Sequence, residues 1–150
     1  MNYLSESILV GIYTLIIYII IFTLFRKMIS IEKSPEYFFF LLGFMKHFLG
    51  DFIQLHTFFC NNGYACKYYF NDSNILYRIS KRKEVVIFTE SILEGLFFVF
   101  IYFLLFSTIK NFQINWIIIF CIGFSLHILF EMTGIHRLFC KYRCSSVLHQ

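Results

Sequence analysis

The chain has 150 residues, of which 59% are hydrophobic, 22% aromatic and only 15% charged, with a net charge of +4. A soluble domain of this length would expose large apolar patches, which drive association, so the composition excludes an ordinary water-soluble fold. Only helices and closed barrels satisfy their backbone in lipid, and the apolar runs here are too long for barrel strands. We therefore predict a single all-α integral membrane domain whose partner is the lipid bilayer.

Four apolar segments predict a four-helix transmembrane bundle. They cover about residues 8–25, 37–59, 85–107 and 114–139, and each is close to the roughly 20 residues that cross a bilayer. Four spans would put both chain ends and the loop before the third span on one side, here called the near side. Eight Lys and Arg residues on that side against four on the other favour a cytoplasmic near side. The charges Arg26 and Lys27 directly after the first span, and a glycosylation sequon at Asn71, argue for the opposite orientation.

A 14-residue pattern occurs twice, as HFLGDFIQLHTFFC from His47 and as HILFEMTGIHRLFC from His127. The pattern predicts a duplicated two-span unit with the second and fourth spans parallel, as in some membrane proteins. Coincidence in a biased composition is the alternative interpretation. At the same offset of 80, the third-span acids Glu90 and Glu94 align with Val10 and Thr14, so we expect the first half to lack these acids.

Three pairs of ionisable residues lie within the predicted spans at i, i+4 spacing, which places each pair on one helix face. Insertion of an unpaired acid into a span costs about 2.5–3.5 kcal/mol, so we expect all six side chains to face the bundle interior. Protonation, pairing with Lys46 or charged histidines, or a bound metal would each offset the charge. The six residues are His47, Asp51, Glu90, Glu94, His127 and Glu131.

A bound divalent metal such as zinc is the interpretation that uses most of these side chains. Two histidines and a carboxylate form a known catalytic zinc set, and His47, His127 and Glu94 would supply it. The remaining acids Asp51 and Glu131 would hold a second metal or serve as general base, as in carboxylate bundles. Glu90 or Glu131 would then transfer the proton of a metal-activated water, which makes Glu90, Glu131 and Asp51 the catalytic candidates.

The near-side end of each repeated segment carries a second histidine and a cysteine. His56 and Cys60, like His136 and Cys140, are spaced i, i+4, and Cys66 and Cys144 follow the two segments. On an ideal helix, His56 points about 180° away from His47, so these rim residues reach the deep site only if the helix bends. Thr133-Gly134 predicts such a break in the second copy, and the first copy has no clear equivalent.

The rim residues allow two different sites. A cytosolic near side would favour a structural zinc site drawn from the four cysteines and the rim histidines. A lumenal near side would favour disulfides, Cys60 with Cys66 and Cys140 with Cys144. Cys121 lies within the fourth span and is expected only to pack.

The segment HFLGDFIQ resembles a His-x3-Asp-Phe-x2-Gln signature of a family of small multi-pass membrane proteins from bacteria and phages. The residues that match are His47, Asp51, Phe52 and Gln54. The resemblance covers one helix of four, and Glu90 and Glu94 stand where the family would have histidines. It implies a small multi-pass membrane protein and supplies no reaction.

Three functions fit the sequence. The first is an intramembrane metal-dependent hydrolase acting on a lipid or lipid-linked group. The second is a metal-ion or proton carrier, which would need a polar path to the far side, where the sequence instead becomes apolar and aromatic. The third is a non-catalytic structural protein of a virion or organelle membrane. No motif indicates binding to nucleic acid.

Overall fold

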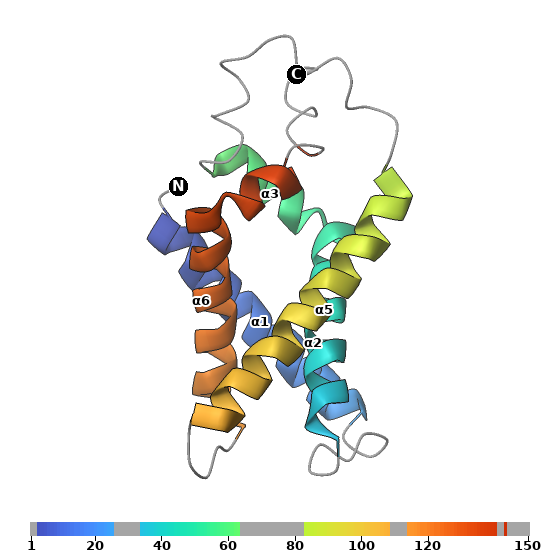
Figure 1. Cartoon of the computed structure of the whole chain (residues 1–150). Helices are drawn as coiled ribbons and strands as arrows, with labels where there is room; N and C mark the ends of the chain where they lie inside the picture. The colour runs from blue at the N-terminus through green and yellow to red at the C-terminus, as the bar shows by residue number, and fades with distance from the viewer. Residues whose placement is uncertain (1–2, 26–33, 64–82, 109–113, 141–142, 144–150) are drawn as a thin grey trace.

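The computed structural model describes residues 3–25, 34–63, 83–108, 114–140 and 143, and these residues are almost entirely helical (Figure 1). Apolar runs this long can satisfy their backbone hydrogen bonds internally only as helices, which is why the composition determines the fold class. The prediction of an all-α chain is confirmed for this part of the molecule. The helices are α1 (Tyr3–Phe25), α2 (Pro35–Phe52), α3 (Leu55–Asn62), α5 (Lys83–Thr108), α6 (Trp116–Thr133) and α7 (Ile135–Cys140).

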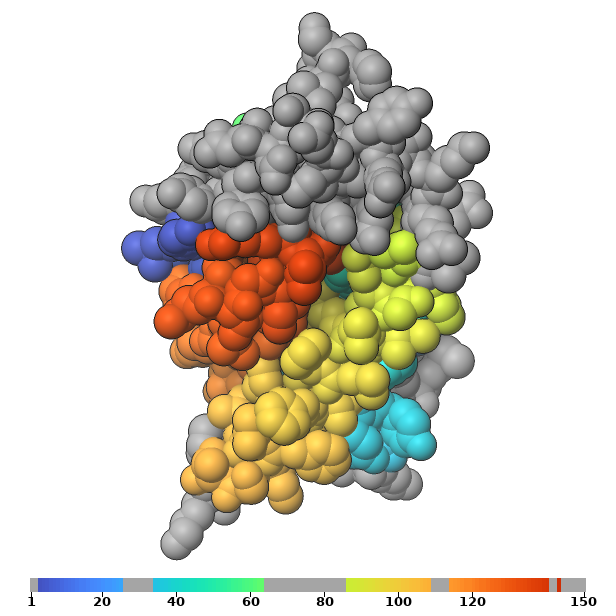
Figure 2. Space-filling view, turned by 45° about the horizontal axis from the view of Figure 1, so that its top comes forward, coloured from blue at the N-terminus to red at the C-terminus, as the bar shows by residue number. Residues whose placement is uncertain are grey.

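Three of these helices, α1, α5 and α6, are long and apolar enough to cross a membrane, and the bent pair α2 and α3 would make a fourth span. Their outer faces carry large exposed apolar side chains, among them Ile19 on α1, Phe100 on α5 and Ile117 on α6. The helices α5, α6 and α7 form most of the described surface on the face drawn in Figure 2. An apolar exterior of this kind suits lipid as the surrounding solvent, so the chain is compatible with an integral membrane protein.

The second and fourth predicted spans are each broken near one end. α2 and α3 are bent by 76° at a short break, and a single residue, Gly134, separates α6 from α7. Gln54 (φ 59°) and Gly134 (φ 77°) adopt the left-handed conformation at the two breaks. Gly134 fulfils the prediction of a break at 133–134, whereas the break at Gln54 is a correction, since a non-glycine residue takes this conformation at a cost.

The two breaks have the same construction. The amide of Gln54 donates to Asp51 O at 2.9 Å, and the amide of Gly134 donates to Glu131 O at 3.2 Å. The next turn then restarts from the carbonyls of the same two residues, which accept from the amides of Phe58 and Leu138. The left-handed residues are 80 positions apart, the separation that also relates His47 to His127.

The long helices associate in two pairs, α1 with α6 and α2 with α5. A glycine brings the helices together in each pair. A Cβ atom added to Gly11 would lie 3.1 Å from the carbonyl oxygen of Phe120, and one added to Gly95 would lie 2.9 Å from that of Phe40. Small residues of this kind let helix backbones approach closely in lipid. Each pair therefore depends on a glycine that faces the partner helix at a matching place.

The apolar core fills the half of the molecule farthest from α3 and α7. It contains Phe38, Phe39 and Leu42 of α2, together with Ile21 of α1 and Phe98 of α5. The short helices α3 and α7 lie at the opposite end, across the space between the two pairs (Figure 1). The polar residues described next are consequently enclosed between a dry core on one side and two short helices on the other.

Candidate metal centre

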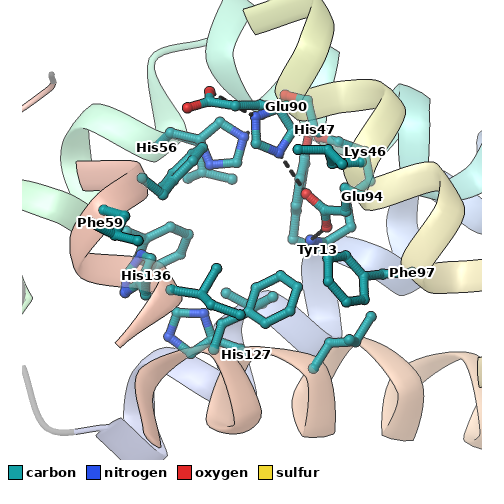
Figure 3. A pocket seen from close by; sticks show the side chains of 18 residues that line it. Tyr13, Lys46, His47, His56, Phe59, Glu90, Glu94, Phe97, His127 and His136 are labelled. Atoms are coloured by element: carbon teal, nitrogen blue, oxygen red, sulfur yellow. Dashed lines mark hydrogen bonds and ion pairs between the residues drawn. The ribbon is translucent and has the colours of Figure 1, made fainter. Parts of the chain in front are cut away.

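A cavity of about 260 Å³ lies between the two helix pairs, beneath α3 and α7. Four of the five histidines line it. His47 and His56 lie on one side, while His127 and His136 lie on the opposite side (Figure 3). Apolar side chains from α1, α3, α5 and α6 form the rest of the wall, including Val10, Phe59, Phe97 and Phe130. The cavity is thus an apolar chamber with ionisable groups on two walls, the usual composition of a small-molecule site.

The wall formed by α2 and α5 carries a group that we call the arginine cluster, consisting of Lys46, His47, Asp51, Glu90, Glu94 and Arg143. In its deeper part, Glu94 is paired with the ammonium of Lys46, and its Oε2 lies 2.5 Å from Nδ1 of His47. His47 Nε2 lies 3.4 Å from Glu90 Oε2. Each buried acid in this cluster therefore has a cationic or imidazole partner, which lowers the cost of burying its charge.

Arg143 holds the shallower part of the arginine cluster together. Its Nη2 donates to Asp51 Oδ1 at 2.8 Å and to Glu90 Oε2 at 2.8 Å, and its Nη1 donates to Phe139 O at 3.0 Å. The guanidinium also lies 3.8 Å from the centre of the Phe139 ring. One buried arginine consequently neutralises acids from two different helices, a task for which its planar fork of donors is suited.

The opposite wall, formed by α1, α6 and α7, carries a second group that we call the Glu6 cluster, made of Glu6, His127, Glu131 and His136. All four side chains are buried, and each offers a ligand atom within 4.8 Å of the others. Glu131 forms a hydrogen bond with Nδ1 of His136, and Glu6 Oε2 lies 3.5 Å from His127 Nε2. A tetrahedral ion with bonds of about 2.0–2.1 Å has ligands about 3.4 Å apart, so a small contraction would bring this set to ion-binding distance.

The Glu6 carboxylate and one ring nitrogen of His127 lack hydrogen-bond partners within the described part of the chain. Both carboxylate oxygens of Glu6 and Nε2 of His127 are buried without one, and the Glu6 residue is 0% exposed. Leaving a buried polar atom unsatisfied costs roughly 1–3 kcal/mol, and more when the group is charged. Two carboxylates and two imidazoles are also a typical ligand set for zinc or another transition metal. The Glu6 cluster therefore combines an unsatisfied charge with the chemistry that would satisfy it.

The predicted ligands are divided between the two clusters rather than gathered in one. His47 and Glu94, which were expected to join His127, belong to the arginine cluster, and His127 belongs to the Glu6 cluster. Of the two predicted second-metal acids, Asp51 is bound by Arg143 and Glu131 lies beside His136. The expected burial of acids and histidines between the helices does hold for His47, Glu94, His127 and Glu131.

The rim histidines reach the deep site, contrary to the expectation from a straight helix. The breaks at Gln54 and Gly134 turn α3 and α7 back across the cavity. The His56 ring lies 4.6 Å from that of His47, and the His136 ring lies 4.9 Å from that of His127. The 100° rotation per residue that separates these side chains applies only along an unbroken helix.

The cysteine pairing also differs from the prediction. Cys60 of α3 forms a disulfide with Cys140 of α7, instead of pairing with Cys66, and the two Cα atoms are 5.4 Å apart. Cys66 and Cys144 lie outside the described residues. His136 Nε2 lies 3.5 Å from Cys140 Sγ, so the predicted rim residues of the second copy do come together. Cys121 is a free, exposed thiol and is not packed in the core.

Glu6 and Arg143 belong to the site although the sequence prediction did not include them. Glu6 was placed before the first span, but α1 begins at Tyr3 and includes it. A signal was present in the sequence, because Glu-Ser-Ile-Leu occurs at residues 6–9 and again at 90–93, an offset of 84 instead of 80. The connection from α1 to α2 is four residues longer than the connection from α5 to α6, and this difference in length shifts the alignment. Arg143 had been counted only as a near-side charge.

No protein-family model, curated protein or solved structure matches this chain. The class of protein that the fold and the site define is accordingly a helical chain with three to four candidate membrane spans and two buried clusters of ionisable residues.

Proposed function

We propose that the protein is an intramembrane metal-dependent hydrolase whose divalent metal is bound by the Glu6 cluster. The observation that carries the proposal is the buried Glu6 carboxylate without a hydrogen-bond partner, within 4.8 Å of ligand atoms of His127, Glu131 and His136. A divalent ion would neutralise the two carboxylates and satisfy His127 at once. Zinc is one of the metals that this mixture of imidazole and carboxylate ligands suits.

In this proposal the metal supplies an activated water at neutral pH. Glu6, His127 and His136 form the set of two histidines and one carboxylate that leaves a position for water. Glu131, which is hydrogen-bonded to His136, would accept the proton of the attacking water and return it to the leaving-group oxygen of the cleaved ester or phosphate. Asp51 and Glu90, which the sequence also indicated as catalytic, are bound by Arg143 and would instead support the opposite wall.

The substrate proposed is a lipid or lipid-linked ester or phosphate. The cavity adjoins the candidate metal ligands His127 and His136, and the apolar side chains that line it would suit a hydrocarbon tail. A carrier is less well supported, because the core of Phe38, Phe39, Leu42 and their neighbours fills the half of the bundle beyond the cavity. A chamber with one polar end fits hydrolysis better than it fits transport across the membrane.

A lipid-turnover assay tests the proposal. Purified protein would be loaded with zinc and incubated with vesicles containing phospholipids and polyprenyl phosphates, and products would be identified by mass spectrometry. We expect one lipid class to be consumed by the wild type, and neither by Glu131→Gln nor by wild type treated with chelator. Zinc-loaded, folded protein that leaves every lipid intact would contradict the hydrolase while leaving the metal site open to other uses.

We also propose that the end of the bundle carrying α3 and α7 faces an oxidising compartment. The disulfide between Cys60 and Cys140 supports this orientation, because disulfides are rare in the reducing cytosol. It reverses the orientation expected from the count of basic residues. The sequon at Asn71, which lies outside the described residues, provides the test. Microsomal translation should attach a glycan that Asn71→Gln removes, and unglycosylated wild type beside a glycosylated reporter would favour the cytosolic orientation.

A further inference from the structure

The two clusters are built from matching positions in the two halves of the chain. An offset of 80 relates α2 and α3 to α6 and α7, and an offset of 84 relates α1 to α5. The second offset aligns Glu-Ser-Ile-Leu in both helices and also Gly11 with Gly95, the two glycines of the helix contacts. The hydroxyls of Ser7 and Ser91, equivalent under this offset, both donate to the carbonyl four residues earlier.

Under these offsets the four members of the Glu6 cluster correspond to four residues of the other half. Each pair conserves its chemical type, acid with acid and histidine with histidine. The pairs are Glu6 with Glu90, His127 with His47, Glu131 with Asp51, and His136 with His56. The chain therefore contains the same set of two acids and two histidines twice, once on each side of the cavity.

One difference between the two sets is a cation that only one of them has. Arg143 of the second half corresponds to Gly63 of the first, at the same offset of 80. Arg143 donates to both Asp51 and Glu90. A Cβ atom added to Gly63 would lie 2.5 Å from the carbonyl oxygen of Phe59, which would have to shift, and 2.8 Å and 3.1 Å from Oε1 and Oε2 of Glu6. A side chain at position 63 would therefore start beside the equivalent acid. The Glu6 cluster thus lacks the cation that its counterpart receives from residue 143.

A second difference leaves the balance of charge unchanged. The arginine cluster contains Lys46 and Glu94, which pair with each other, where the other half has Leu126 and Val10. One cation and one anion are added together, so their charges cancel. Arg143 is therefore a cation for which the other set has only a glycine at the corresponding position, and its guanidinium donates to both of the acids that it bridges.

We infer that the chain carries two divalent-cation sites at corresponding positions, of which the second, formed by Asp51, Glu90, His47 and His56, is held open, and closed to metal, by the guanidinium of its own Arg143. Its ligand atoms are not gathered as those of the Glu6 cluster are, and His56 Nε2 lies 3.0 Å from the carbonyl oxygen of His47. The inference rests on the metal site of the proposed function and extends it. Because a fixed monovalent side chain fills one site, only the Glu6 cluster is left for a free metal ion. The centre is mononuclear for this reason, although the chain has ligands for two ions.

Reciprocal exchange of the two residues tests this inference. The measurement is bound zinc per chain in purified protein, by elemental analysis after equilibration with zinc and removal of free metal. We expect one zinc for wild type, none for Gly63→Arg because the new guanidinium would bind Glu6, and two for Arg143→Gly. The double variant Gly63→Arg with Arg143→Gly should bind one zinc, and that zinc should be lost when Glu90→Gln is added but kept when Glu6→Gln is added.

The outcomes separate the inference from the proposed function. One zinc in wild type and still one in Arg143→Gly would overturn the inference and leave the proposed site intact. No zinc in wild type would overturn the proposed site, while a zinc gained in Arg143→Gly would still support the equivalence. If Arg143→Gly does not fold, Gly63→Arg decides, since a folded Gly63→Arg protein that keeps its zinc contradicts the inference.

Discussion

Replacing Glu6 with glutamine should stabilise the metal-free protein and abolish its stabilisation by zinc. Glutamine has nearly the volume of glutamate but carries no charge, so it removes the buried charge that has no hydrogen-bond partner. The same substitution removes the carboxylate from the proposed ligand set of Glu6, His127 and His136. Glu6→Gln should therefore raise stability without metal and lower the stabilisation by zinc. A purely structural role for Glu6 would not produce this combination.

The magnitudes follow from the burial of Glu6. Glutamine remains a buried polar group, so the gain comes only from removing the charge. Because an unpartnered charged group costs more than the roughly 1–3 kcal/mol of a neutral one, the free energy of unfolding of the metal-free protein should rise by about 1 kcal/mol or more. Zinc at 100 times its dissociation constant should stabilise wild type by about 2.7 kcal/mol. For a chain of this length, that corresponds to an increase in Tm of about 5–10 °C. Glu6→Gln should show almost none of this increase.

Thermal unfolding in detergent, with chelator and then with zinc, measures both effects. Glu36→Gln is the matched control, because Glu36 also lies in the first turn of its helix and is outside both clusters. The control should keep the full zinc-dependent increase in Tm. A Glu6→Gln protein that is less stable than wild type in chelator, and equally stabilised by zinc, would refute the assignment of Glu6 as a ligand.

Three further predictions concern the scaffold, and each is checked by thermal unfolding of the detergent-solubilised protein. Cys60→Ser removes a disulfide that joins residues 80 apart, so it should lower the free energy of unfolding by up to about 4.5 kcal/mol, whereas Cys121→Ser should change it little. Equal Tm values for these two variants would argue against the disulfide. Gln54→Gly should stabilise the protein by about 1 kcal/mol because φ is 59° there, and Gln54→Ala should not; a destabilised glycine variant would contradict a left-handed Gln54. Gly43→Ala should cost about 1–3 kcal/mol, since its Cβ would lie 2.7 Å from a carbonyl oxygen of α5, and a neutral result would mean that α2 and α5 are farther apart.

The fold class and the burial of the ionisable residues could be predicted because both follow from composition. A chain this apolar has few ways to satisfy its backbone, and a charge in lipid costs enough to force it inward. α5 was predicted to within two residues at its N-terminus and one at its C-terminus. The break at Gly134 could be predicted for a different, local reason: glycine adopts the left-handed conformation without strain.

The division of the site into two clusters could not be predicted from helix periodicity. A regular helix sends His56 away from His47, and only the left-handed Gln54, a residue with no sequence signature for that conformation, reverses this. The choice of partner helices could not be predicted either, because no local sequence pattern indicates that α1 packs on α6 and α2 on α5. Glu94 therefore met Lys46 and His47 of α2, and His127 met Glu6 of α1.

The role of Arg143 depends on contacts between distant parts of the chain. It is 92 residues from Asp51 and 53 from Glu90, and no spacing rule connects residues so far apart. Its significance appears only when the two halves are compared and Gly63 is found at the corresponding position. A comparison of the halves at two offsets, one for each part of the repeated unit, would have indicated both Glu6 and this asymmetry.

Elemental analysis of the purified protein tests the central claim most directly. We expect one divalent metal ion per chain in wild type, and the same in His47→Ala, whose histidine belongs to the arginine cluster. His127→Ala, the equivalent substitution in the Glu6 cluster, should lose the ion. Folded wild-type protein without stoichiometric metal, or equal loss in both variants, would contradict a metal centre at Glu6, His127, Glu131 and His136.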